Sequence, residues 1–125
     1  MAWTGDPVWI KDVLADALGD RFRAIPGWQQ TGHGDFREIK GVMIHHTGND
    51  RESAASIKRG RPDLQGPLSQ LHIDRHGIVT LVALGVAWHA GRGSYPGIPP
   101  NSANWHTIGI ECAWQIGRAS CRERV

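Results

Sequence analysis

The sequence predicts an α/β domain with a mixed central β-sheet and flanking helices. Three observations lead to this fold class. Residues 40–46 form a short apolar run that is typical of a strand, and residues 107–113 alternate apolar and polar side chains with the period of a strand. Residues 10–18 repeat apolar side chains with the period of a helix. A chain of 125 residues suits one domain with a modest core.

The first predicted element is a helix that carries one apolar face. Asp6 followed by Pro7 predicts its start, because an N-cap acceptor precedes the residue favoured at the first helical position. Gly19 predicts its end. Its apolar positions have helical spacing: Ile10, Val13, Leu14, Ala17 and Leu18. A Gly- and Pro-rich loop over residues 25–35, held by Trp28, is expected to follow.

The strand predicted over residues 40–46, which we expect to be central, ends on two adjacent histidines. His45 and His46 must point to opposite faces, because side chains alternate along a strand. Residues 53–60 predict a short helix with a Ser cap and a Gly stop, and residues 60–67 predict a loop.

The second half of the chain predicts a hairpin and a last core strand. Residues 68–74 and 78–84 flank a turn at residues 75–77, and a long loop covers residues 92–104. In the strand 107–113, alternation places Glu111 on the face opposite to its apolar neighbours, Ile108, Ile110 and Cys112. We therefore expect about four strands.

Composition and charge exclude several partners. The last ten residues hold three Arg and one Glu, which leaves eleven basic and eleven acidic side chains in residues 1–115. This balance gives no argument for binding nucleic acid or a membrane surface. No apolar run reaches the roughly 20 residues of a membrane span, and no secretory signal is evident, so we expect synthesis in the cytoplasm. Cys112 and Cys121 have no metal-type spacing and do not indicate a disulfide framework. We expect a monomer.

The distribution of the seven histidines suggests a site. His45 ends a strand, His89 lies at a strand exit, and His106 directly precedes the strand that carries Glu111. Imidazole ligands and a carboxylate fit a metal-hydrolase cleft, and Trp88 could contact the substrate, as could Trp105.

Each of these residues also has an ordinary interpretation. A His-His pair near a strand end is more often structural, His106 equally fits a loop histidine, and Glu111 fits a solvated sheet face. Tryptophans of this kind belong to the core or its rim more often than to a sugar-binding surface. The remaining histidines that we place in turns or hairpins are expected at the surface: His33, His72 and His76.

Three blocks together resemble the type-2 N-acetylmuramoyl-L-alanine amidases, whose zinc amidase fold is shared with peptidoglycan-recognition proteins. The blocks are Val-Met-Ile-His-His-Thr at 42–47, the two runs at 73–81 and 87–91, and Asn-Trp-His-Thr-Ile-Gly-Ile-Glu at 104–111. The segments 26–36 and 60–69 are also similar to actinobacteriophage endolysins. The resemblance covers about residues 8–115 and implies an amidase-like α/β fold.

The resemblance implies roles for particular residues. His45 matches the first ligand of a Zn²⁺ cofactor, and Glu111 matches the carboxylate that activates the zinc-bound water. Ser69 stands where members without this Glu have a tyrosine. The resemblance and the predicted cleft together suggest a set of substrate-binding residues: His46, Trp88, His89, Asn104 and His106. The implied substrate is the amide between N-acetylmuramic acid and L-alanine in peptidoglycan.

The end of the chain departs from the family. The family's second His and its later Asp or Cys ligand lie beyond the Glu strand. We therefore expect residues 1–115 to be the N-terminal part of a single amidase domain, truncated at its C-terminus, and residues 116–125 to be an unrelated tail. Because catalytic zinc takes three protein ligands, affinity should fall steeply, and Cys112 is expected on the wrong face to substitute.

Three functions remain in competition on this basis. The first is zinc-dependent cell-wall lysis by a phage-type amidase, impaired by the loss of two ligands, made in the cytoplasm of an infected bacterial host and acting on its wall. The second is a peptidoglycan-binding module that keeps the cleft without the chemistry. The third is a structural fragment without a function of its own. Zinc content and muropeptide hydrolysis distinguish the first from the others.

Overall fold

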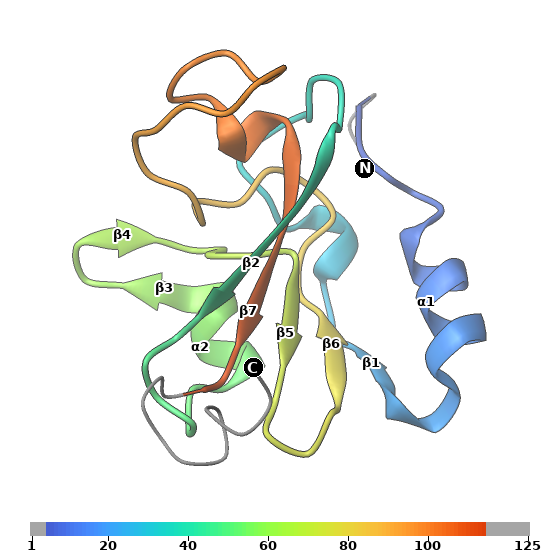
Figure 1. The fold of residues 1–125 in the computed structure, drawn as a ribbon. Coiled ribbons are helices and arrows are strands. Elements are labelled where there is room, and N and C mark those ends of the chain that lie inside the picture. The colour runs from blue at the N-terminus through green and yellow to red at the C-terminus, as the bar shows by residue number, and fades with distance from the viewer. Residues whose placement is uncertain (1–4, 115–125) are drawn as a thin grey trace.

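A computed structural model of the protein describes residues 5–114 and contains a five-stranded sheet of order β1-β6-β5-β7-β2 (Figure 1). The strands β5 and β6 pair antiparallel and the other neighbours pair parallel, so the sheet is mixed and the predicted fold class is confirmed. The bounds of its strands are β1 Phe22–Ala24, β2 Gly41–His46, β5 Leu71–Ile73, β6 Val79–Leu81 and β7 Thr107–Cys112. No helix in residues 5–114 is both long and apolar enough to cross a membrane.

Helix α1, Ile10–Leu18, begins later than predicted. Asp6 does not cap it; the N-cap position belongs to Trp9, whose side chain makes no capping hydrogen bond. The predicted end is confirmed, because Gly19 has a φ of 58° there. Val13 was expected on the buried face but is 54% exposed, since only one narrow stripe of this helix meets the sheet.

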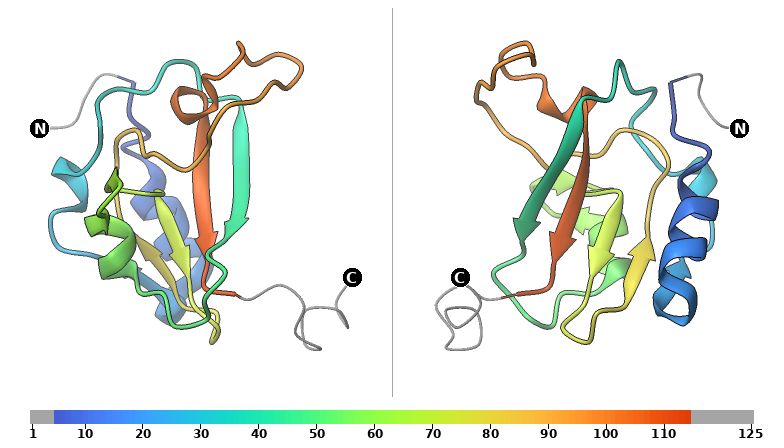
Figure 2. Two further views of the ribbon diagram at one scale, coloured as in Figure 1. Left: turned by 90° about the vertical axis from the view of Figure 1, so that its left-hand side faces the viewer. Right: turned by 45° about the vertical axis from the view of Figure 1, so that its right-hand side comes forward.

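The two helices cover opposite faces of the sheet. Helix α1 belongs to a core cluster on the face of Leu71 and Leu81, whereas α2, Ala54–Arg59, packs Ile57 on the other face. In the right-hand view of Figure 2, α1 lies at the β1 edge and α2 lies behind the strands. The predicted Ser53 cap of α2 is confirmed, because its Oγ accepts a hydrogen bond from the amide of Ser56 at 3.1 Å.

Strand β2 lies at an edge of the sheet rather than at its centre as we expected. It pairs only with β7 among the described strands. Its outward side chains on one face, Val42 and Ile44, are 56% and 73% exposed. The apolar run 40–46 is therefore a strand of the predicted extent, but its apolar character does not reflect burial on both faces.

Other differences from the prediction concern short segments. The loop expected at residues 60–67 contains a small hairpin, β3 Gly60–Arg61 and β4 Leu64–Gln65. Strand β1 was not predicted, because its three residues are too few to show alternation. The predicted turn at 75–77 is confirmed: the Asp74 carboxylate accepts from the amides of His76 and Ile78. The hairpin strands β5 and β6 are shorter than expected.

A buried glutamine joins the sheet to the loop beside it. Gln70 is completely buried; its Nε2 donates to the carbonyl of Gly85 at 2.9 Å, and its Oε1 accepts from the amide of Gly109 in β7 at 2.6 Å. Both backbone groups would lose their partner without this side chain. Gln70 therefore fixes the middle of β7, the strand that carries Glu111.

Replacing Gln70 with Leu is expected to lower the free energy of unfolding by about 3 kcal/mol, because the change leaves a buried amide and a buried carbonyl unpaired. Urea denaturation measures this loss. The exposed Gln29, changed to Leu, is the matched control and should change stability by less than about 0.5 kcal/mol. Equal effects of the two substitutions would contradict this role of Gln70.

Candidate active site

The site is organised around His45 and Glu111, which lie side by side on one face of the sheet. Strands β2 and β7 pair in parallel with His45 opposite Glu111, and β5 places His72 opposite Glu111 on its other side. Residues opposite each other in neighbouring strands share a face. The predicted alternation therefore holds, and the pair faces the side of the sheet that α2 covers in part.

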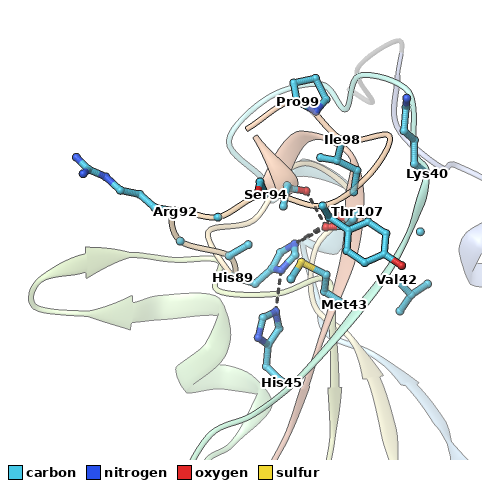
Figure 3. Close-up of a pocket in the computed structure, with 16 residues that line it drawn as sticks. Lys40, Val42, Met43, His45, His89, Arg92, Ser94, Ile98, Pro99 and Thr107 are labelled. Carbon is cyan, nitrogen blue, oxygen red and sulfur yellow. Dashed lines mark hydrogen bonds between the residues drawn. The ribbon is translucent and has the colours of Figure 1, made fainter. Parts of the chain in front are cut away.

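His89 lies directly over β7 and contacts His45. Its ring occupies the space where Gly109 has no side chain, since a Cβ at Gly109 would overlap the ring. His45 Nε2 and His89 Nδ1 are 3.0 Å apart (Figure 3). Residues 87–91 form no strand, so His89 reaches this place from an irregular segment. We did not predict the role of Gly109, although a glycine inside an alternating strand often marks a place where another group packs closely against the backbone.

The contacts of His89 determine which ring nitrogens carry protons. His89 Nε2 lies 3.3 Å from the carbonyl oxygen of Thr107, which can only accept, so this nitrogen carries the proton. Burial above all lowers the pKa of His89 to about 4, with a contribution from the neighbouring His45, so the ring is neutral at pH 7.

It follows that His89 Nδ1 accepts a hydrogen bond from His45 Nε2. A neutral imidazole carries one proton. In neutral His45 this proton is on Nε2, so Nδ1 carries none. Burial, followed by the nearby His46, lowers the pKa of His45, which also favours the neutral form. The site thus holds one imidazole nitrogen with a free lone pair in a fixed direction.

Glu111 has the electrostatics of a proton-transfer group. Burial raises its pKa to about 7, the Arg61 guanidinium opposes this rise, and the Glu52 carboxylate adds to it. A carboxyl group with this pKa exchanges its proton readily near neutral pH. Arg61 was not predicted as a site residue, because the loop expected at 60–67 gave no indication that it would lie next to β7.

Two cavities lie on either side of the segment His89–Gly91. The larger, about 640 Å³, is bounded by the first half of β2 and the loop after Gly91, with Met43 and Tyr95 in its walls (Figure 3). The smaller, about 560 Å³, lies between the β3–β4 hairpin and Trp88, and Glu111 lines it. His89 lines both cavities, whereas His45 lines only the larger and Glu111 only the smaller.

Trp88 lines the smaller cavity, but its ring is already engaged. His33 stacks on it with a centroid distance of 4.1 Å and an interplanar angle of 8°, and Trp105 meets it edge-on at 5.5 Å. The guanidinium of Arg37 lies over Trp105. The expectation that His33 is an ordinary surface residue is wrong, because its ring supports one face of Trp88.

Asn104, predicted to bind substrate, uses its side chain within the protein. Its Oδ1 accepts from the amides of His89 at 3.0 Å and Ala90 at 2.7 Å, and its Nδ2 donates to the carbonyl of Ala90 at 2.9 Å. It borders the smaller cavity. Its role in this structure is to hold the backbone that carries His89.

Three further histidines line neither of the two cavities. His106 is buried, its Nδ1 bonds the carbonyl of Glu38 at 2.8 Å, and it lines neither cavity. His46 lies on the face opposite His45, where its Nδ1 accepts from the amide of Gly48 at 3.1 Å. His72 is only 4% exposed, and its Nε2 lies 2.7 Å from the carbonyl of Glu52, so the prediction of a surface position is wrong.

The described residues do not form a complete metal site. Within residues 5–114 there is no group of three or more His, Cys, Asp or Glu side chains that could hold a metal ion. Catalytic zinc takes three protein ligands, and here His45 and His89 are bonded to each other. Cys112 lies opposite His46, on the face away from Glu111, as predicted. Cys121 lies outside the described residues.

Comparison with known proteins gives one match. The family model described as N-acetylmuramoyl-L-alanine amidase matches residues 35–123, which include β2, β7 and every residue of the site described above except His33. No curated protein and no solved structure matches the chain significantly. The matched range also runs into residues 116–123, where the sequence predicts an unrelated tail; that boundary stays a prediction.

Replacing Glu111 with Gln is expected to stabilise the fold at pH 8 and to change little at pH 4. The pKa of Glu111 in the folded protein, about 7, exceeds the ordinary 4.5, so the folded state binds this proton more tightly than the unfolded state. The parent therefore loses stability as pH rises from about 4.5 to about 7, whereas Gln has no proton to lose. Because solvent screens the half-buried carboxylate, the gain is about 1 kcal/mol.

Urea unfolding at both pH values measures this difference, and comparison at equal pH cancels the contributions of the histidines. Glu38 is exposed, and its change to Gln serves as the control. A difference of the same size at pH 4 and pH 8 would show that the pKa of Glu111 is not raised.

Replacing Asn104 with Leu is expected to speed hydrogen exchange at the amides of His89 and Ala90 by about tenfold or more, because both lose their acceptor. The change to Asp keeps an acceptor oxygen and should preserve much of the protection. Exchange measured by NMR distinguishes the variants. Protection that is unchanged in Asn104→Leu would show that other contacts hold this segment.

Proposed function

Because the chain belongs to the N-acetylmuramoyl-L-alanine amidase family, we propose that it hydrolyses the amide between the lactyl group of N-acetylmuramic acid and L-alanine in peptidoglycan. One observation supports this proposal independently of the family match. Glu111, a carboxyl group whose pKa is raised to about 7, lines the smaller cavity and lies beside His45, which lines the larger one. A substrate with the scissile amide beside these two side chains would reach both cavities.

Glu111 supplies the proton transfers that amide hydrolysis needs. As the ionised carboxylate, it accepts a proton from the water whose oxygen bonds to the amide carbon. It then returns that proton to the amide nitrogen while the carbon–nitrogen bond breaks, so the products are the muramic carboxyl group and the free amine of L-alanine. A pKa near the working pH suits both halves of this cycle.

His45 and His89 act as a preorganised pair in this proposal. The hydrogen bond from His45 to His89, together with the contact of His89 with Thr107, fixes the direction of the free nitrogen of His45. This nitrogen is the one we propose as the family's first zinc ligand. The residues described do not fit a three-ligand site, so any zinc bound here needs ligands from outside residues 5–114.

We also propose the setting of this activity. The similarity of segments 26–36 and 60–69 to phage endolysins suggests a lysin that is made in the cytoplasm of an infected bacterium and acts on its cell wall. Degradation of peptidoglycan would then serve lysis of the host.

A second candidate function is a peptidoglycan-binding module without catalysis. The observation that favours it is the same absence of a three-ligand group among residues 5–114. Both cavities would still be available to a sugar–peptide ligand. The two candidates differ in one measurable outcome, the appearance of new L-alanine amino groups.

The parent chain, supplied with zinc and purified peptidoglycan, is expected to release new N-terminal L-alanine. Glu111→Gln should slow this release by about 100-fold or more, because it removes the general acid–base group, while binding to insoluble cell wall is unchanged. Dinitrophenylation of the released amino groups gives the rate, and a pull-down gives the binding. The control Glu38→Gln should behave as the parent.

The outcomes separate the candidates. Binding to the cell wall without any release of L-alanine amino groups by the parent would replace the amidase by the binding module. Release that is equally fast in Glu111→Gln would exclude Glu111 as the acid–base group and leave the amidase in place.

A further inference from the structure

We propose that Arg61 binds a carboxylate on the peptide part of the substrate and so makes the smaller cavity the peptide side of the cleft. This inference rests on the proposed function, since it names the part of the substrate that each cavity receives. It assigns a specificity-determining role to a residue of the β3–β4 hairpin that takes no part in the proposed proton transfers.

The lining of the smaller cavity has one cationic side chain, Arg61, and one carboxyl group, Glu111. Its walls include Leu64, Leu68 and Trp88, and Arg61 is the one Lys or Arg among the described residues that lines it. A guanidinium group at the rim of an apolar wall fits a ligand with an apolar body and a terminal carboxylate. Asn104, an amide in the same lining, uses its Oδ1 and one of its two Nδ2 hydrogens in backbone hydrogen bonds.

The guanidinium of Arg61 is available to a ligand. Its ion pair with Asp63 has an N–O distance of 3.6 Å, and the two side chains are 60% and 81% exposed. An exposed pair of this kind contributes little, so a substrate carboxylate can exchange with Asp63 at small cost. Arg61 also acts electrostatically on Glu111, so an anion bound to it would lie next to the proposed acid–base group.

The backbone places Arg61 in a defined position. The hairpin closes where Gly60, with a φ of +89°, meets Gly66 so closely that a Cβ on either residue would overlap backbone atoms. The amide of Gly66 donates to the carbonyl of Arg59 at 3.2 Å, and the amide of Leu68 donates to that of Ile57 at 2.9 Å. The hairpin is therefore tied to α2, and Arg61 is carried on a fixed support rather than on a free loop.

The chemistry of the substrate decides which end reaches Arg61. The lactyl carboxyl of muramic acid is consumed in the scissile amide, so its negative charge is absent until the bond breaks. The peptide, in contrast, carries its own free carboxylates. The larger cavity also has cationic side chains in its lining, but Lys40 Nζ donates to the carbonyl of Gly97 at 2.6 Å, and the Arg92 side chain points away from the other labelled residues (Figure 3). Arg61 therefore favours the peptide for the smaller cavity and leaves the larger one, with Tyr95 and Met43 in its walls, for the sugar.

Two probes that differ only in charge test this inference: N-acetylmuramoyl-L-alanyl-D-glutamate and its diamide. Titration calorimetry with the parent chain should show about fivefold tighter binding of the acid, the value of one partly exposed ion pair. Arg61→Gln should abolish this preference, and Arg61→Lys should retain part of it. The control Arg59→Gln removes the same charge from an exposed position outside both cavities and should keep the preference.

The results distinguish the role of Arg61 from the proposed function. Equal binding of acid and diamide by the parent, or a preference that survives Arg61→Gln, overturns the role of Arg61 and leaves the proposed function intact. If the parent binds neither probe and releases no L-alanine from peptidoglycan, the proposed function fails and the inference fails with it. Circular dichroism of each variant confirms that the fold is retained.

Discussion

The site depends above all on the parallel pairing of β2 with β7. One register sets His45 beside Glu111 and sets Met43 beside Gly109, whose missing side chain leaves room for the ring of His89. A shift by one residue would move His45 to the opposite face and separate it from Glu111. The buried side chain of Gln70 holds β7 at Gly109, so the core fixes the strand on which the chemistry depends.

What the sequence could predict was local. Alternation along a strand depends only on neighbouring residues. The position of Glu111 on the face opposite its apolar neighbours, and the opposed directions of His45 and His46, could therefore be foreseen. The order of strands depends on pairings between distant segments, and the edge position of β2 was therefore missed. His72 was misjudged for the same reason, because its place in a hairpin does not reveal that the segment before α2 covers it.

Resemblance identified the neighbourhood of the cleft better than the function of each residue. Asn104 and His89 do border a cavity, but the polar atoms of Asn104 serve the backbone, and only the structure shows this. His106 directly precedes β7, as the sequence indicates, but its Nδ1 is bonded to the backbone carbonyl of Glu38. Arg61 lies in the segment 60–69 that resembles endolysins, but the sequence did not indicate its approach to Glu111, which follows from the folding of the β3–β4 hairpin.

Within residues 5–114, the hydrogen bond from His45 to His89 leaves Nδ1 of His45 free. Long-range ¹H–¹⁵N spectra of the histidine rings at pH 7 test it most directly. We expect two neutral rings, with protons on Nε2 of both His45 and His89. A proton on Nδ1 of His45, or an imidazolium at His89, would contradict it.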